Sequence, residues 1–334
     1  NPVAMMEYSK DFTSTLRTLG SMFAELKIVD GLSFRTVVGF DQSQSERKAA
    51  YSSLLNIASV KDVGGRVFTT NVETGSRLWE NYFTYDKGFG NVSLNAVAGY
   101  SYQKFNYANN ALEVVGFRTT NLDLMINNIA SADQSADGNN VVIRNSSGNE
   151  DELQSYFGRV NLGFADKYLF TATVRADGST RFGPNNKYGI FPAFAFKWRM
   201  GAESFMPEAL SSLGLRLGYG VTGNQEIGRN QYSSRERYND WDIDAGGNIG
   251  GGGISFVSFT NPDLKWESTQ QINVGVDYAF ANGRVAGSLD FYNKRTNDLL
   301  FLVVAAQPSP QPFNFENIDG VVINQGVELG LNLV

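Results

Sequence analysis

The chain has 334 residues and a formal net charge of -6, and its 35 glycines, 13% aromatic residues and 19% charged residues favour a turn-rich β protein over a helical one. The acidic balance argues against nucleic-acid binding, which requires a concentrated basic surface. Because cysteine and histidine are both absent, the composition excludes disulfides, zinc sites of the Cys/His kind, thiol nucleophiles and Ser-His-Asp catalysis.

Alternation of apolar and polar residues predicts about eleven strands, most of them in pairs joined by short turns. The pairs are, in chain order, 15–29 with 32–41, 77–86 with 92–103, 154–164 with 168–177, 190–200 with 213–222, and 266–280 with 284–294. A last alternating run reaches Val334 without closing a hairpin, so we expect a section of a larger sheet. No run of about 20 apolar residues occurs, so no transmembrane helix is predicted.

The connections between these strands alternate in length. Short turns join the members of each pair, whereas polar segments at 42–76, 104–152, 223–265 and 295–324 separate the pairs, and only 178–189 is a short link. This alternation, with strands of about 9 to 15 residues, is typical of transmembrane β-barrels. Aromatic residues near the strand ends suggest an interfacial girdle, although ordinary β-formers explain them as well. They are Tyr168, Trp198, Tyr219, Trp266, Tyr278 and Phe280.

Period-two alternation assigns the side chains of these strands to two faces. In a membrane barrel the apolar face meets lipid and the polar face lines the lumen, whereas in a soluble sandwich the apolar face would cover a core. The predicted lipid-facing residues are Phe170, Val174, Phe194, Phe196, Leu215, Leu217, Val274, Val276, Leu289 and Phe291. The predicted inward residues are Thr171, Arg175, Lys197, Arg216, Asn273, Asp277 and Asp290.

Several short motifs occur in order along the chain. They are KIVDGLSFRT at 27–36, GYSYQ at 99–103, YFGRVN at 156–161, DKYL at 166–169, RADGSTRFGP at 175–184, YGVTGNQ at 219–225, NPDLKWE at 261–267 and NQGVEL at 324–329. Together they resemble the SusC/RagA-type TonB-linked (TonB-dependent) outer-membrane transporters over nearly the whole chain. The predicted fold is therefore all-β, a transmembrane antiparallel β-barrel section of about eleven strands from a plugged barrel of roughly 22 strands.

The resemblance also implies an organisation and a function. Residues 1–334 would be part of a single barrel domain, without the plug domain and the closing strands. The protein would import a bulky nutrient, an oligosaccharide or a peptide, across the outer membrane of a Gram-negative cell. A SusD-like surface lipoprotein would serve as its lid, and TonB would supply energy through the plug. Two alternatives remain open, a TonB-dependent siderophore or cobalamin receptor and a secreted glycan-binding β-sandwich adhesin.

Candidate site residues fall into two groups. In a predicted outer loop, the aromatic rings of Tyr232, Tyr238 and Trp241 suit stacking on sugar rings or holding peptides, with loop packing as the alternative. On the lumen side, charged residues suit contacts with a plug, with solvation of a wet interior as the alternative. These residues are Arg159, Arg175, Asp177, Arg181, Arg216, Glu267, Asp277 and Asp290.

Some functions are not expected. Asp240, Asp242 and Asp244 alternate on an acidic stretch, but the remaining pattern of a calcium loop is missing, so no metal site is predicted. Because there is no histidine and no nucleophile constellation, we expect no enzymatic activity, no catalytic residues and no cofactor.

Overall fold

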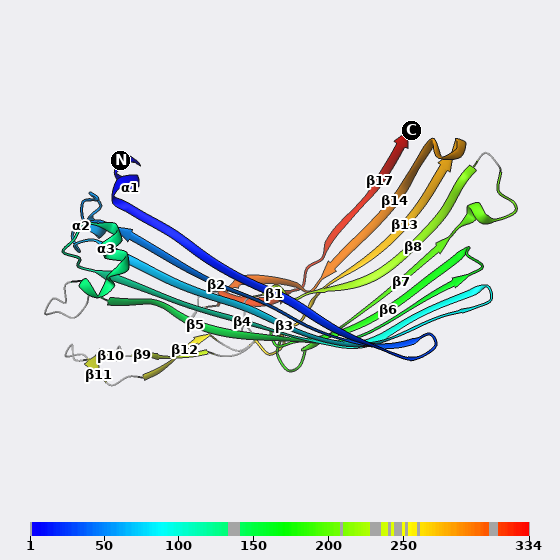
Figure 1. The fold of residues 1–334 in the computed structure, drawn as a ribbon. Helices are drawn as coiled ribbons and strands as arrows, with labels where there is room; N and C mark the ends of the chain where they lie inside the picture. Colours follow the sequence, from blue (N-terminus) through cyan, green and yellow to red (C-terminus); the bar gives the residue numbers. More distant parts are fainter. Residues whose placement is uncertain are drawn as a thin grey trace. The chain divides into compact units, whose positions relative to one another are not determined.

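The computed structural model describes residues 2–132, 141–207, 210–227, 235–239, 242–243, 249–250, 253–258, 261–306 and 313–333. Its main feature is one sheet of eleven strands, each paired with the strand before it in the order β1-β2-β3-β4-β5-β6-β7-β8-β13-β14-β17 (Figure 1). These strands are β1 (Ser9–Val29), β2 (Leu32–Tyr51), β3 (Arg66–Phe89), β4 (Val92–Val115), β5 (Val141–Phe164), β6 (Tyr168–Ser179), β7 (Tyr188–Trp198), β8 (Leu210–Asn224), β13 (Glu267–Phe280), β14 (Val285–Asn297) and β17 (Val322–Leu333). The predicted all-β fold and the predicted strand number are confirmed.

Smaller elements lie in the long connections. The short strands pair as β9 (Arg235–Asn239) with β12 (Gly253–Ser258), β10 (Asp242–Ile243) with β11 (Ile249–Gly250), and β15 (Leu299–Val304) with β16 (Phe313–Ile318). The helices are α1 (Pro2–Tyr8), α2 (Ala58–Lys61), α3 (Leu122–Asn127), η1 (Ile129–Ser131), η2 (Met200–Ala202) and η3 (Ala281–Gly283). None of the helices in the described part of the chain has the length and apolar composition needed to cross a membrane.

The chain divides into two compact units, which we describe separately. Unit 1 comprises Asn1–Met22, Val38–Leu78 and Gln103–Asp151, and unit 2 comprises Phe23–Val37, Trp79–Tyr102 and Glu152–Val334. Each unit has a buried apolar cluster. The cluster of unit 1 consists of Ala50, Val67, Val114, Phe117, Met125, Ile126 and Ala132. Part of it lies on α3, where the side chain of Asn121 caps the first turn by accepting a hydrogen bond from the Leu124 N–H at 3.1 Å.

The predicted hairpin turns are present, and local backbone chemistry explains them. At the β1–β2 turn Gly31 has φ of 81°, and a Cβ there would lie 2.7 Å from the carbonyl oxygen of Asp86, so only glycine fits. The β5–β6 turn places Ala165 and Asp166 at φ of 52° and 55°. The β13–β14 turn uses Asn282 and Gly283 at φ of 57° and 86°, as the Asn-Gly pair predicts.

The strands of unit 1 extend further than the sequence predicts. β2, β3, β4 and β5 have 20 to 24 residues, so they cover much of the predicted polar loops 42–76 and 104–152. These extensions are polar on both faces and therefore show no apolar alternation, but the backbone ladder continues regardless. Side-chain pairs support it, because Asp11 accepts from Arg47 at 2.9 and 2.5 Å and Thr15 lies 2.9 Å from Ser45.

The register of unit 2 confirms that the two predicted sets of side chains lie on opposite faces. One row of paired residues is Phe170, Phe196, Leu217, Val274 and Phe291, and the neighbouring row on the other face is Leu169, Lys197, Arg216, Gly275 and Asp290. No residue of the predicted lipid-facing set is buried, and Val174 and Leu289 are 50% and 47% exposed. The apolar face therefore covers no core among the described residues, as the sandwich alternative would require.

One predicted girdle residue is in the wrong place. Trp266 is only 9% exposed and belongs to the buried cluster of unit 2, with Phe182, Ile227 and Leu264. It lies just before β13, in the connection that reaches back over the strand ends, so it packs against loop residues. We call these four residues the loop cluster.

Candidate functional site

Four charged side chains meet on the polar face of unit 2. Arg216 on β8 donates from Nη2 to Asp290 Oδ1 at 2.8 Å and from Nε to both Asp277 oxygens at 3.0 Å. Lys197 on β7 donates from Nζ to Asp277 Oδ2 at 3.2 Å. We call Lys197, Arg216, Asp277 and Asp290 the Arg216 cluster. The structure thus brings together three of the predicted lumen residues and adds Lys197.

Strand register explains how the Arg216 cluster forms. Arg216 pairs across the sheet with Lys197 on one side and with Gly275 on the other, and Gly275 pairs with Asp290. A Cβ at Gly275 would lie 2.2 Å from Asp290 Oδ1 and 2.9 Å from Arg216 Cζ, so glycine gives the two side chains room to meet above the backbone.

A hollow lies beside the Arg216 cluster on the same strands. It has a volume of about 380 Å³, and its polar lining comes from Thr171, Lys197, Arg216 and Asn273. The side chains of Arg216, Asp277 and Asp290 are 39%, 34% and 22% exposed, so they are accessible to a partner. Two cations and two carboxylates balance one another, and such a surface suits hydrogen bonding to a polar partner more than binding of a strongly charged one.

Arg175 and Asp177 form a second charged group on β6. Arg175 donates from Nε to Asp177 Oδ1 at 2.6 Å and from Nη2 to the buried Ser155 hydroxyl at 2.7 Å. Arg159 lies in the adjacent hollow of about 350 Å³, which Glu80 and Phe157 also line. Arg159 is exposed and has no ion pair with any residue that the structure describes.

The other two predicted lumen residues, Arg181 and Glu267, lie in the long connections near the loop cluster. Arg181 donates from Nη1 to the main-chain oxygen of Gln225 at 3.2 Å and lies 3.5 Å from Glu226. Glu267 accepts hydrogen bonds from Asn224 Nδ2 at 3.0 Å and from the Leu300 N–H at 3.1 Å. Glu267 therefore ties the end of β8 to the β15–β16 hairpin.

The loop cluster joins two motifs that are far apart in the sequence. The Phe182 ring, from RADGSTRFGP, lies 5.0 Å from the Trp266 ring of NPDLKWE, and Trp266 Nε1 donates to the Lys187 oxygen at 3.1 Å. Gly183 permits this approach, because a Cβ there would lie 2.4 Å from the Pro262 oxygen. Sequence reasoning found both motifs but did not predict their contact.

Asn317 on β16 extends this arrangement. Its Oδ1 accepts from the Lys265 N–H at 2.9 Å, and its Nδ2 donates to the main-chain oxygens of Lys265 and Asp298 at 2.8 and 2.9 Å. The Lys265 ammonium also lies 2.8 Å from Asp298 Oδ1. The β15–β16 hairpin is thus fastened at its base to the NPDLKWE segment.

A carboxylate that sequence reasoning missed lies at the other end of the strands. Glu203 accepts from Lys167 Nζ and the Tyr168 hydroxyl at 2.7 Å each, and from Trp198 Nε1 at 3.2 Å. These donors, Lys167 foremost, lower the pKa of Glu203 from 4.5 to about 2. Glu203 therefore links the β5–β6 turn to the β7–β8 connection; its position in a short polar connection gave no sequence signal.

The predicted aromatic cargo residues are not located. Tyr232 and Trp241 lie outside the described residues, and so does the side chain of Tyr238, so their role stays a prediction. Asp240 and Asp244 also lie outside them. Among the residues with described side chains, no group of three or more acidic residues is placed to hold a metal ion.

Comparison with known proteins gives consistent matches. The family described as "TonB dependent receptor-like, beta-barrel" matches residues 8–334. TonB-dependent receptor P3 of Formosa agariphila is 34% identical over 99% of this chain and 32% of its own length. TonB-dependent receptor SusC of Bacteroides thetaiotaomicron is 38% identical over 54% of this chain and 18% of its own length.

Solved structures agree on the fold. The structure of the RagAB peptide transporter matches with a TM-score of 0.84 and 24% identity, over 98% of this chain and 35% of the matched chain. This chain therefore spans about a third of the length of P3 and of the matched RagAB chain.

Proposed function

Because the chain belongs to the TonB dependent receptor-like β-barrel family, we propose that it is a section of an outer-membrane transporter that imports a bulky nutrient with energy from TonB. The observation that carries this proposal is the sheet of unit 2, which has exposed apolar rows on one face and the Arg216 cluster on the other. A membrane barrel needs these two faces, one for lipid and one for a wet lumen.

We propose that residues 1–334 belong to one barrel domain and that the polar face contacts a plug. The hollows beside Arg216 and Arg159 offer donors and acceptors that solvent reaches in this chain. A plug carrying polar side chains would satisfy them without the cost of burying unpaired charges. Transport would then proceed without any chemical change of the cargo.

The cargo that we propose is an oligosaccharide or a peptide, delivered under a SusD-like lipoprotein lid. Support comes from the names of similar proteins, SusC and the RagAB peptide transporter, which favour this cargo over a siderophore. Within this chain, Trp241 and Tyr238 are the proposed cargo contacts. An aromatic ring can cover the apolar face of a sugar or of an amino-acid side chain in an otherwise wet vestibule.

Uptake by intact cells tests the function. Cells with and without the full-length gene, and cells lacking TonB, would receive fluorescent oligosaccharides, fluorescent peptides and a ferric siderophore. We expect uptake of an oligosaccharide or peptide that requires both the gene and TonB. Uptake of the siderophore alone would support the receptor alternative, and a protein absent from the outer-membrane fraction would contradict the proposal.

The same panel tests the cargo contacts by calorimetry on the purified full-length protein with its lid. Trp241→Ala should weaken binding of the cargo by about 1 to 3 kcal/mol, as loss of a central aromatic anchor does. An unchanged affinity would remove Trp241 from the site, and chemical conversion of any cargo would overturn the non-enzymatic assignment.

A further inference from the structure

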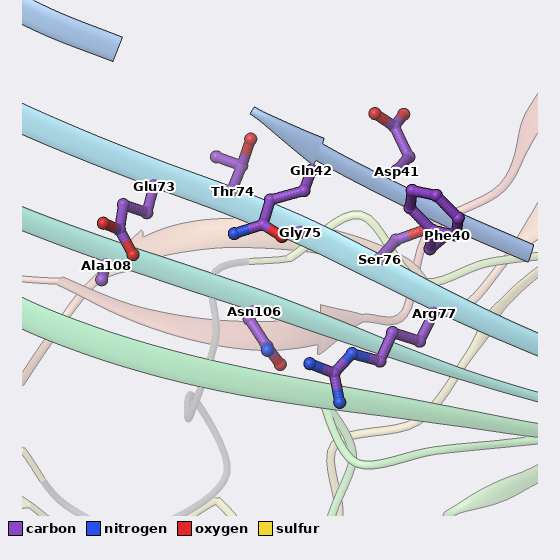
Figure 2. A pocket seen from close by; sticks show the side chains of 10 residues that line it. All are labelled: Phe40, Asp41, Gln42, Glu73, Thr74, Gly75, Ser76, Arg77, Asn106 and Ala108. Atoms are coloured by element: carbon purple, nitrogen blue, oxygen red, sulfur yellow. The ribbon is translucent and has the colours of Figure 1, made fainter. Parts of the chain in front are cut away.

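A small polar hollow in unit 1 is not explained by import. It has a volume of about 120 Å³ and lies on the neighbouring strands β2, β3 and β4 (Figure 2). Its lining residues are Phe40, Asp41, Gln42, Glu73, Thr74, Gly75, Ser76, Arg77, Asn106 and Ala108. Figure 2 shows the side chains of Gln42, Arg77 and Asn106, one from each of the three strands, around Gly75, which has no side chain to fill the space.

The two faces of β2 differ at this hollow. Asp41 belongs to one face, and its carboxylate pairs with Arg17 on β1 at 2.9 and 2.5 Å. By period two, Val38, Phe40 and Gln42 belong to the opposite face, where Val38 and Phe40 are 54% and 50% exposed. An exposed apolar face opposite an ion-paired face is the arrangement that we assign to lipid and lumen in unit 2. The hollow therefore lies where an apolar, lipid-type face becomes polar.

Two polar groups in the hollow lack partners. The side-chain oxygen of Asn106 is buried and accepts no hydrogen bond from the described residues. Arg77 is exposed and forms no ion pair with the part of the chain that the structure describes. Glu73 is four residues away along the strand, roughly 13 Å, so it does not neutralise the guanidinium. A buried orphan acceptor and a free guanidinium together call for a ligand with hydroxyl and anionic groups.

We propose that this hollow binds the headgroup of a phosphorylated glycolipid in the membrane leaflet around the barrel. The Arg77 guanidinium would hold a phosphate through paired N–H groups, which suit its planar geometry. Asn106 Oδ1 would accept a hydrogen bond from a sugar hydroxyl, and an acyl chain would pass over Phe40 and Val38. This inference rests on the proposed membrane insertion, but it concerns the face opposite the lumen and so needs no cargo.

Native mass spectrometry of the full-length protein, released from its detergent micelle, tests the inference. The probes are lipid A, a diglucosamine lipid with two phosphates, and the same lipid after enzymatic dephosphorylation. Arg77→Gln should weaken lipid A binding about fivefold, the effect of one basic side chain at an anionic headgroup. It should leave the dephosphorylated lipid unaffected, whereas Asn106→Ala should weaken binding of both lipids.

The matched control is Arg17→Gln, which makes the same charge change on the neighbouring strand but on the opposite face. It should leave lipid A binding unchanged. Equal losses in Arg17→Gln and Arg77→Gln, or equal binding of both lipids by the unaltered protein, would overturn the inference. Membrane fractionation separates the two proposals: absence from the outer membrane overturns both, whereas outer-membrane protein with no response to Arg77→Gln overturns only the lipid site.

Discussion

The sheet of unit 2 and the loop cluster use apolar side chains in opposite ways. On the sheet, Val174 and Phe291 are 50% and 44% exposed, although they belong to continuous rows of apolar residues. In the loop cluster, Phe182 and Leu264 are 1% and 0% exposed. The two regions are joined through β6, β7 and β13, so one stretch of chain changes its rule for burial within a few residues.

This difference indicates that the two regions are built for different solvents. A continuous apolar face is costly in water, but it is the surface that a lipid bilayer requires. Long connections have no sheet ladder to satisfy their backbone groups, so they need their own packed core and side-chain hydrogen bonds. Trp266 illustrates the second rule, because its ring is buried and its N–H bonds to a main-chain oxygen.

Emptying the loop cluster should have the largest effect. Phe182→Ala removes a ring that is buried between the two motifs, so we expect a loss of about 3 to 5 kcal/mol in the local free energy of unfolding. Hydrogen exchange of the backbone amides of Leu264 and Trp266 in the full-length protein measures this loss. The control is Phe301→Ala on β15, where the side chain is 50% exposed and the loss should be below about 0.5 kcal/mol. Equal losses in the two variants would show that the loop cluster is not a core.

A charge placed on either face of the sheet should separate lipid from lumen. Val274→Arg puts a guanidinium on the apolar face and should destabilise the protein in phospholipid vesicles by about 2 to 4 kcal/mol, because lipid cannot solvate it. Asn273→Arg makes the same addition one residue away on the polar face and should cost much less. Urea unfolding measured by tryptophan fluorescence gives both values. If Asn273→Arg is the more damaging change, the assignment of the two faces is reversed.

The sequence predicts the sheet better than it predicts the connections. Alternation in 168–177 and 266–280 identifies both the strands and their faces, because the side-chain period of a strand is a local property. Contacts such as Phe182 with Trp266 depend on how long connections return over the strand ends, and no local pattern encodes this. The polar ends of β2 to β5 were missed for a related reason, since backbone pairing leaves no mark on side-chain polarity.

The candidate site divides in the same way. Arg216, Asp277 and Asp290 were predicted on one face, and their meeting follows from register once β8, β13 and β14 are neighbours. The position of Glu267 at the base of the β15–β16 hairpin was not predictable, because it depends on a loop contact with Leu300.

A double-mutant cycle on the Arg216 cluster probes the polar face with a smaller effect. Arg216→Ala and Asp290→Ala should show a coupling of about 0.5 to 1 kcal/mol, because both side chains are partly exposed and solvent screens the pair. The coupling should fall in about 1 M salt, where the screening length is about 3 Å. A larger, salt-insensitive coupling would mean that another part of the full-length protein covers the cluster, as the proposed plug contact requires. A coupling of zero at low salt would contradict the ion pair.

The smallest expected effect is a pH dependence at the short-turn end of the sheet. The pKa of Glu203 is lowered from 4.5 to about 2 by its bonds to Lys167, Tyr168 and Trp198, so the folded state favours the ionised carboxylate. Its contribution to stability is therefore complete above about pH 4.5 and is lost as the pH falls through the folded value near 2. Acid titration of the full-length protein in vesicles, followed by hydrogen exchange of the Trp198 indole N–H, should show this loss. Glu203→Gln should remove most of the pH dependence between 4.5 and 2, whereas Glu316→Gln, at an exposed position on β16, should leave it intact. If both variants retain the full dependence, other carboxylates control the acid response, and Glu203 does not fasten the β5–β6 turn to the β7–β8 connection.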